Sequence, residues 1–242
     1  MKDDILYLKE FRDIYSDPKI NFMKLNKIFF ALIIFLIQLP TVFAQQSEII
    51  KYVTQPGSRL WIEGSSTIND FNCRARLVKG FAFIHSKDNL NEKFSKGFKK
   101  DKDKDEVVVT VLVHSLDCGL DAMNDDMYRA MKASQFPILR YDLIDAHLIS
   151  SVDSLGWFDL ATKGDLTIAG ETNAIDIIVK VQNLPDGAFR LVGNKNLSMK
   201  DYGIEPPSHL WGLLKAHNRL KVFFDLIVAI EKPTSQNPPA QK

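Results

Sequence analysis

The most regular hydrophobic pattern in the chain is a period of two that runs from Trp157 to Val181. Its first half places one set of residues on one side: Phe158, Leu160, Thr162, Gly164, Leu166 and Ile168. Its second half aligns Ile175, Ile177, Val179 and Val181. A period of two is typical of a β-strand, and Gly170 between the halves tolerates the positive φ of a tight turn. The pattern predicts a long antiparallel hairpin whose apolar face packs inside a sandwich or barrel.

Further extended segments surround this hairpin. Two strands are expected within Ser58–Cys73, and others at residues 77–84, 107–114, 141–150, 189–192 and 218–229. The run VVVTVLVH at 107–114 is the most apolar of these and predicts a central strand. In 141–150 the alternation sets Tyr141, Leu143, Asp145 and His147 against Ile144, Ala146 and Leu148. Residues 194–209 are expected to form a loop. The fold class predicted is all-β, an antiparallel barrel of about eight strands.

One short helix interrupts the strands, at about residues 124–133. Met123, Met127, Ala130 and Met131 recur at helical spacing and give this segment one apolar face. Asn124 is expected to be its N-cap, with two aspartates in the first turn. Pro137 then returns the chain to an extended conformation.

A long charged loop is expected at residues 85–106, where Lys, Asp, Glu and Asn dominate. Such a run buries too little apolar area to offset the entropy of ordering it, so a mobile surface loop is predicted. Asp101, Asp103 and Asp105 alternate in the manner of calcium ligands. The lysines between them and the missing loop glycine favour a solvated charge run over a calcium site.

The N-terminal part has the pattern of an export signal. Residues 28–39 are almost purely apolar, follow Lys24 and Lys27, and precede a small-residue site that predicts cleavage between Ala44 and Gln45. The apolar run is shorter than the about 20 residues that span a bilayer. Met23 is the expected start of translation, because the charged residues before it are unusual ahead of a signal. The organisation predicted is residues 1–44 as extension and signal peptide, 45–57 as an exposed lead-in, 58–230 as the barrel and 231–242 as a disordered tail.

Cys73 and Cys118 both lie in the part predicted to be exported. An even number of cysteines in an oxidising compartment favours one disulfide, and two buried thiols are the alternative. Two thiols without a nearby histidine pair do not have the spacing of a zinc site, so no metal is expected.

Candidate catalytic residues are few. The five histidines are scattered, and the group of His114, Ser115 and Asp117 cannot form a triad easily because neighbours on a strand point to opposite faces. No phosphate-binding glycine loop or nucleophile motif is present in the sequence. The formal net charge of +1 argues against a nucleic-acid surface. The protein is therefore expected to be no enzyme and to need no cofactor.

Three blocks of the sequence resemble one known family. Residues 164–172, GDLTIAGET, look like the G-x-L-T-I-x-G-x-T signature of the YceI-like, lipocalin-like family. Ser115-Leu116, Arg129, Phe136-Pro137, Leu139 and Tyr141 resemble its second block, and residues 200–204 resemble its D-(F/Y)-G-(I/V) loop. The family's R-D-x-H-L helix is replaced here by residues 123–128, so a role of that histidine is not carried over. The resemblance implies a periplasmic or secreted barrel that binds isoprenoid-type lipids.

The function expected is that of an exported carrier with an isoprenoid or fatty chain in the barrel interior, not a transmembrane protein. The alternation of the strands assigns the cavity lining to eight residues: Phe81, Phe83, Val109, Val111, Leu166, Ile168, Val222 and Phe224. The alternative is a packed barrel or sandwich without a ligand, acting as an interaction module through its 85–106 and 202–204 loops. The volume of the interior distinguishes the two.

Overall fold

The computed structural model describes residues 49–85, 90–101, 105–209 and 214–232. The cleavage site expected at Ala44–Gln45, the start expected at Met23 and most of the C-terminal tail lie outside the described residues.

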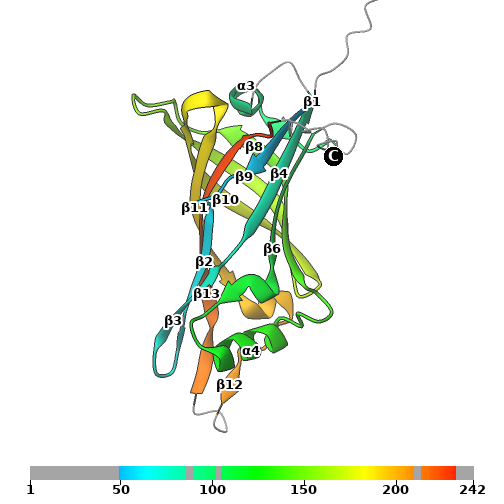
Figure 1. Ribbon diagram of the computed structural model, residues 1–242, viewed down its shortest axis with the longest axis vertical. Coiled ribbons are helices and arrows are strands. Elements are labelled where there is room, and N and C mark those ends of the chain that lie inside the picture. Colours follow the sequence, from blue (N-terminus) through cyan, green and yellow to red (C-terminus); the bar gives the residue numbers. More distant parts are fainter. Residues whose placement is uncertain (1–48, 86–89, 102–104, 210–213, 233–242) are drawn as a thin grey trace, which may run out of the picture. The chain divides into compact units, whose positions relative to one another are not determined.

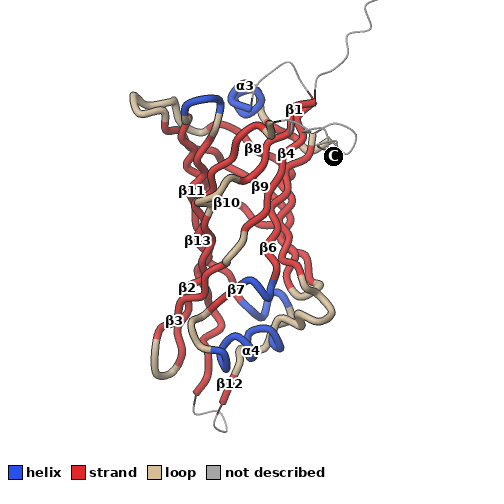
Figure 2. The backbone as a smooth tube through the Cα atoms, in the orientation of Figure 1, coloured by secondary structure: helices blue, strands red, loops and turns tan. Residues whose placement is uncertain are grey.

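Eight antiparallel strands close into a barrel (Figures 1 and 2). In the order in which they pair, they are β1 (Ile49–Thr54), β4 (Val78–His85), β6 (Glu106–Leu112), β8 (Ile138–Leu148), β9 (Trp157–Ile168), β10 (Glu171–Asn183), β11 (Phe189–Ser198) and β13 (Leu214–Ile230). Pairing of β1 with β13 completes the ring. The predicted all-β fold is therefore confirmed.

β13 has two partners on its second side. Its C-terminal part pairs with β1, from Val228 to Ile230, and Ala216 and residues 220–225 pair with β2 (Arg59–Ser66). β1 and β2 are separated by only four residues, 55–58, so the chain leaves one half of the barrel and enters the other at this break. β2 then continues into β3 (Asp70–Ala75), which pairs with the short β7 (Leu116–Asp117).

The predicted hairpin is present as β9 and β10, with an unbroken ladder from Glu171–Ile168 to Gln182–Trp157. Ala169 and Gly170 form its turn with φ of 51° and 87°, and two consecutive positive φ values are typical of a type I′ turn. Phe158, Leu160 and Val181 are buried on the inner face, as the period of two predicts.

Two strands differ from the sequence-based expectation. β1 lies in the stretch 45–57 that was expected to be an exposed lead-in, and its Tyr52 is buried. In β8 the register shifts between Leu143 and Asp145, which is a β-bulge. Because the extra residue reverses the alternation, Leu143 and Ala146 are both buried, whereas they were assigned to opposite faces.

The helix of the sequence analysis is α4, but it spans Asp121–Ala130, three residues before the expected range. Asn124 is not its N-cap. That position is held by Leu120, which offers no side-chain cap, while Asn124 is buried within the helix and bonded to the preceding loop.

Within the charged segment, the described residues 90–101 form regular structure where a mobile loop was expected. They contain the helix α3 (Leu90–Ser95) and the two-residue strand β5 (Phe98–Lys99), which pairs with β8. Phe94 and Phe98 are buried, with ring centroids 6.2 Å apart, and Lys93 forms an ion pair of 2.6 Å with Asp105. These two phenylalanines bury apolar surface that stabilises the segment, although its average composition is dominated by charged residues.

Short helical turns and a further strand complete the fold. They are η1 (Val113–Ser115), η2 (Pro185–Gly187), η3 (Met199–Tyr202) and β12 (Ser208–His209), which pairs with β13. β11 and η3 occupy much of the region 194–209 that was expected to be a loop, because β11 extends to Ser198 on its long ladder with β13.

Candidate functional site

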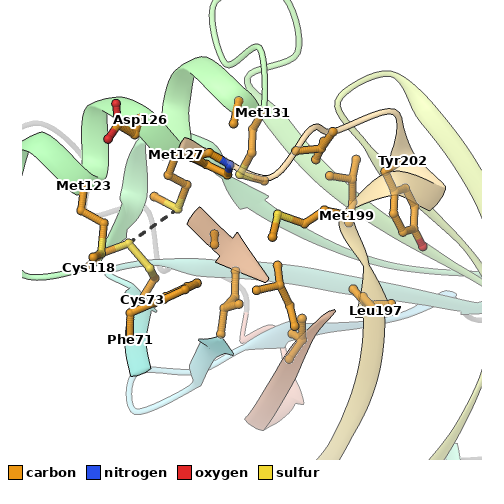
Figure 3. A pocket seen from close by; sticks show the side chains of 18 of the residues that line it. Phe71, Cys73, Cys118, Met123, Asp126, Met127, Met131, Leu197, Met199 and Tyr202 are labelled. Atoms are coloured by element: carbon orange, nitrogen blue, oxygen red, sulfur yellow. Dashed lines mark hydrogen bonds between the residues drawn. A yellow bond between two sulfur atoms is a disulfide. The ribbon is translucent and has the colours of Figure 1, made fainter. Parts of the chain in front are cut away.

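The barrel interior holds two apolar cavities. The first, of about 700 Å³, is here called the large cavity and lies at the end of the barrel that carries α4 and η3 (Figures 1 and 3). The second, of about 200 Å³, is the small cavity and lies among β4, β6, β8, β9, β10, β11 and β13. Six residues line both cavities and are here called the shared ring: Leu60, Val109, Tyr141, Leu166, Leu197 and Val222. The two cavities therefore meet end to end.

The face of α4 that turns toward the large cavity is rich in methionine. Met123, Met127, Ala130 and Met131, the four residues of the predicted apolar face, all line it. Figure 3 shows Met127 of α4 and Met131, which directly follows this helix, on the same side of the large cavity as Met123, with the Met127 sulfur directed toward Cys118. Methionine side chains are unbranched and flexible, so this wall can change its shape at low cost. α4 thus acts as a cover over this end of the barrel.

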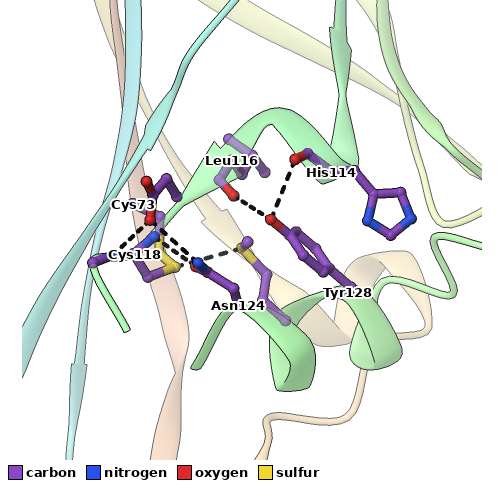
Figure 4. The surroundings of a disulfide bond; sticks show 9 residues. Cys73, His114, Leu116, Cys118, Asn124 and Tyr128 are labelled. Atoms are coloured by element: carbon purple, nitrogen blue, oxygen red, sulfur yellow. Dashed lines mark hydrogen bonds between the residues drawn. A yellow bond between two sulfur atoms is a disulfide. The ribbon is translucent and has the colours of Figure 1, made fainter. Parts of the chain in front are cut away.

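The predicted disulfide is present and ties this cover to the sheet. Cys73 of β3 is bonded to Cys118, which lies between β7 and α4 (Figure 4). Both cysteines line the large cavity, and the Cys118 Sγ is 3.8 Å from the Met127 Sδ. The bridge closes a loop with a sequence separation of 45 residues.

Hydrogen bonds also attach α4 to the chain before it. The Asn124 Oδ1 accepts a bond of 2.7 Å from the Cys118 backbone N–H, and the Asn124 Nδ2 donates to the Asp117 Oδ1 at 3.2 Å. The Tyr128 hydroxyl donates to the backbone carbonyl of Leu116 at 2.7 Å (Figure 4). These bonds, together with the disulfide, fix the position of the cover.

Asp117 is held ionised in this cluster. The Arg76 guanidinium bonds to its carboxylate at 2.7 Å and lowers its pKa to about 2, and the backbone N–H of Gly119 and the side chain of Asn124 act in the same direction. The carboxylate therefore keeps its charge, and its bonds to Arg76, Gly119 and Asn124, over the whole physiological range.

Seven of the eight predicted lining residues border a cavity. Val111 and Ile168 line the large cavity, Phe81 and Phe224 line the small one, and Val109, Leu166 and Val222 line both. Whether they contact a ligand remains a prediction.

Phe83 lines neither cavity. Val78, Ala82 and Ile84 of one face of β4 are buried, whereas Phe81 and Phe83 are half-buried on the alternate face, where Phe81 still borders the small cavity. Their rings pack against each other there, with centroids 5.2 Å apart, and Lys51 lies over Phe83. Both faces of this strand are largely apolar, so alternation alone does not decide which of its side chains border a cavity.

Several lining residues were missed by the sequence analysis. They come from β2, the β2–β3 turn, η3 and the segment after it: Leu60, Ile62, Ile68, Met199, Tyr202 and Ile204. Leu60 and Ile62 alternate in the sequence and could have been found by their period, whereas no local pattern marks Met199, Tyr202 or Ile204 as parts of a wall.

The described residues provide no catalytic or metal-binding arrangement. His114, Ser115 and Asp117 make separate contacts: the His114 ring packs edge-on against Tyr128, the Ser115 hydroxyl bonds to the Leu112 carbonyl, and Asp117 pairs with Arg76. Within the described ranges, no group of three His, Cys, Asp or Glu side chains is placed to hold a metal ion. Among the helices that the structure describes, none has the length and hydropathy needed to cross a membrane.

Comparisons with known proteins agree with this fold. Of the solved structures, a polyisoprenoid binding domain from Saccharophagus degradans, implicated in plant cell wall breakdown, is similar with a TM-score of 0.56 and 14% identity. The alignment covers 76% of this chain and 100% of that domain. BcnA from Burkholderia cenocepacia is similar with a TM-score of 0.51 and 11% identity, over 70% of this chain and 95% of BcnA. At these identities the likeness concerns the fold alone.

The search of curated proteins finds no match to this sequence. The model of the YceI-like domain, in contrast, matches residues 67–227, which is more than half of the chain. That range contains most of the barrel together with the α4 cover and the disulfide. The chain therefore belongs to the family of YceI-like domain proteins.

Proposed function

We propose that this protein is an exported carrier that holds a long apolar ligand, of the isoprenoid or fatty-acid type, inside its barrel. The observation that carries the proposal is the pair of cavities that meet at the shared ring, of about 700 and about 200 Å³. Ligand pockets commonly occupy about 300–1,000 Å³ and are lined mainly by apolar side chains. The large cavity falls within this range.

Free energies of transfer favour a long chain over a short one. Each buried methylene contributes about 0.8 kcal/mol, so about ten of them contribute about 8 kcal/mol. Association costs about 4–15 kcal/mol in lost translational and rotational freedom. A short chain would hardly offset this cost, whereas a chain that extends from the large cavity through the shared ring into the small one would exceed it.

The family supports the same class of ligand. The similar domain from Saccharophagus degradans is described as polyisoprenoid binding. A disulfide between Cys73 and Cys118 fits an oxidising compartment, and the N-terminal pattern predicts a cleaved signal. We therefore place the protein in the periplasm or outside the cell. N-terminal sequencing of the native protein tests this, with Gln45 as the expected first residue.

The alternative, a packed barrel that acts as an interaction module, is less favoured. A solid interior would leave no void of several hundred Å³. One of the two loops that this alternative would present, residues 202–204, is also largely withdrawn from solvent, because Tyr202 and Ile204 are 3% and 6% exposed and line the large cavity.

Mass spectrometry of lipids that co-purify with the native exported protein tests the proposal directly. We expect a long-chain apolar lipid at close to one molecule per chain, and uptake of an apolar fluorescent probe after the lipid is extracted. A native protein that carries no lipid, and a delipidated protein that takes up no probe, would contradict the carrier function.

A further inference from the structure

β10 and β11 are hydrogen-bonded to each other only near one end. Their ladder runs from Asn183–Phe189 to Val179–Gly193 and stops there. β10 nevertheless stays paired with β9 as far as Glu171, and β11 stays paired with β13 as far as Ser198. Residues 171–178 and 194–198 therefore face each other without a backbone ladder. We call this part of the wall the β10–β11 seam.

Lys195 bridges the seam. Its Nζ donates a hydrogen bond of 2.6 Å to the backbone carbonyl of Asp176 on β10. Lys195 is paired with Val222 of β13, a member of the shared ring, so its side chain belongs to the inward face of β11. Among the described residues that line the small cavity, Lys195 is the only one with a formal charge. One carbonyl uses only one of the three N–H donors of its ammonium group.

Tyr141 brings a second donor to the same cavity. Its hydroxyl oxygen is buried and has no hydrogen-bond partner in the part of the chain that the structure describes. The nearby Thr162 hydroxyl donates to the Ile177 carbonyl at 2.9 Å and keeps its acceptor lone pairs, and its interaction with Tyr141 opposes part of the rise in the Tyr141 pKa. Burial raises the pKa of Tyr141, so the hydroxyl keeps its proton and remains a donor. A buried hydroxyl without a partner is destabilising unless a bound molecule supplies one.

The two donors converge on the same part of β10. The Tyr141 ring lies across Gly164 of β9, where a Cβ would come within 2.4 Å of the ring. Gly164 is paired with Ile175 of β10, next to the Asp176 carbonyl that Lys195 contacts. The Asp176 carboxylate lies on the exposed outer face, opposite Lys163, although its charge and that of Asp165 contribute to the raised pKa of Tyr141.

We propose that the Tyr141 hydroxyl and the Lys195 ammonium together bind the anionic head group, carboxylate or phosphate, of a ligand whose apolar chain fills the cavities. This inference rests on the proposed carrier function and adds the chemistry of one end of the ligand. Both groups are donors, so they select an oxygen-rich acceptor. Hydrogen bonds between an ammonium and an anionic oxygen are about twice as strong as neutral ones, which favours an acid over the matching alcohol.

Displacement of an apolar fluorescent probe from the delipidated protein tests the site. Two pairs of competitors are used, and the members of each pair have the same apolar chain and differ in the head group. The first pair is palmitic acid and hexadecanol, and the second is a prenyl phosphate and its prenol. We expect one acid or both to displace the probe about tenfold more tightly than its alcohol. Preference within the first pair indicates a carboxylate ligand, and preference within the second a phosphate ligand.

Variants test whether the preference for the acid over the alcohol depends on residues of the β10–β11 seam. Lys195→Met keeps the aliphatic stem and is expected to bring the acid down to the affinity of the alcohol, while Lys195→Arg keeps the preference. Tyr141→Phe keeps the ring over Gly164 and is expected to weaken acid binding several-fold. The matched control is Lys180→Met, which removes an exposed lysine from the outer side of β10 and should change nothing.

Two outcomes overturn the inference in different ways. If acid and alcohol compete equally, or if the preference for the acid survives in Lys195→Met, the proposed head-group site at Tyr141 and Lys195 is wrong and the carrier function stands. If neither the probe nor any competitor binds, the carrier function itself is wrong, and the proposed head-group site is then wrong as well. Circular dichroism of each variant checks that it has the fold of the parent protein.

Discussion

Enlarging a residue of the shared ring distinguishes a hollow interior from a solid one. Val109 faces inward on β6, opposite Gly80 and Tyr141, and lines both cavities. Val109→Phe adds about four carbon atoms, and burial contributes about 0.8 kcal/mol for each methylene-sized group, so the added side chain can stabilise the fold by up to about 3 kcal/mol. In a close-packed interior the same change would cost about 1–3 kcal/mol through strain.

Urea unfolding of the delipidated protein, followed by circular dichroism, measures the effect. We expect Val109→Phe to leave the free energy of unfolding unchanged or to raise it, and to reduce uptake of an apolar probe because the ring would obstruct the junction between the cavities. Val181→Phe is the matched control. Val181 is fully buried and lines neither cavity, so this variant should lose about 1–3 kcal/mol. Equal destabilisation of the two variants would refute the hollow interior.

Three further predictions concern the walls and the cover. Gly164→Ala would bring a Cβ within 2.4 Å of the Tyr141 ring and should lower the free energy of unfolding by about 1–3 kcal/mol in urea titrations, with partial recovery in the double variant that also carries Tyr141→Ala. Replacing Cys73 and Cys118 by serine should lower it by about 4 kcal/mol, as estimated from the loop that the bridge closes, and a reductant should then have no further effect. The folded-state pKa of Asp117 is lowered from 3.8 to about 2, so the stability it contributes is present above about pH 4 and is lost as the pH falls toward 2. Unfolding midpoints at pH 6 and pH 3 should therefore differ less in Asp117→Asn than in the parent protein, and an equal difference would contradict the assigned role.

Strands with one polar and one apolar face were predictable from the sequence. The β9–β10 hairpin has its alternation, its turn at Gly170 and its buried face where the period of two places them. β4 shows the limit of this reasoning. One face carries the small Gly80 and Ala82 and the other carries Phe81 and Phe83, and side-chain size does not show that Phe81 borders the small cavity whereas Phe83 borders neither cavity. Register with the neighbouring strands decides the face, and register depends on residues far away in the sequence.

The cavities themselves could not be predicted from alternation. A period of two says which side chains point inward, but the void depends on how far apart the opposing strands lie and on what covers the ends. The helical pattern of Met123, Met127, Ala130 and Met131 identified α4 and its apolar face, yet it did not say that this face covers the barrel. Phe94 and Phe98 were overlooked for a different reason. Two buried rings in a charged segment are diluted when composition is averaged over its length.

β13 pairs with β11 along most of its length, with β2 in one half of the barrel and with β1 in the other. β13 therefore belongs to the walls of both cavities. Separation of this strand from its neighbours would open both cavities to solvent. A ligand bound in either cavity should therefore disfavour the local opening that exposes the other cavity, because both openings require β13 to separate from its neighbouring strands. If the protein carries the proposed ligand, its whole apolar chain should therefore dissociate in one step rather than one segment at a time.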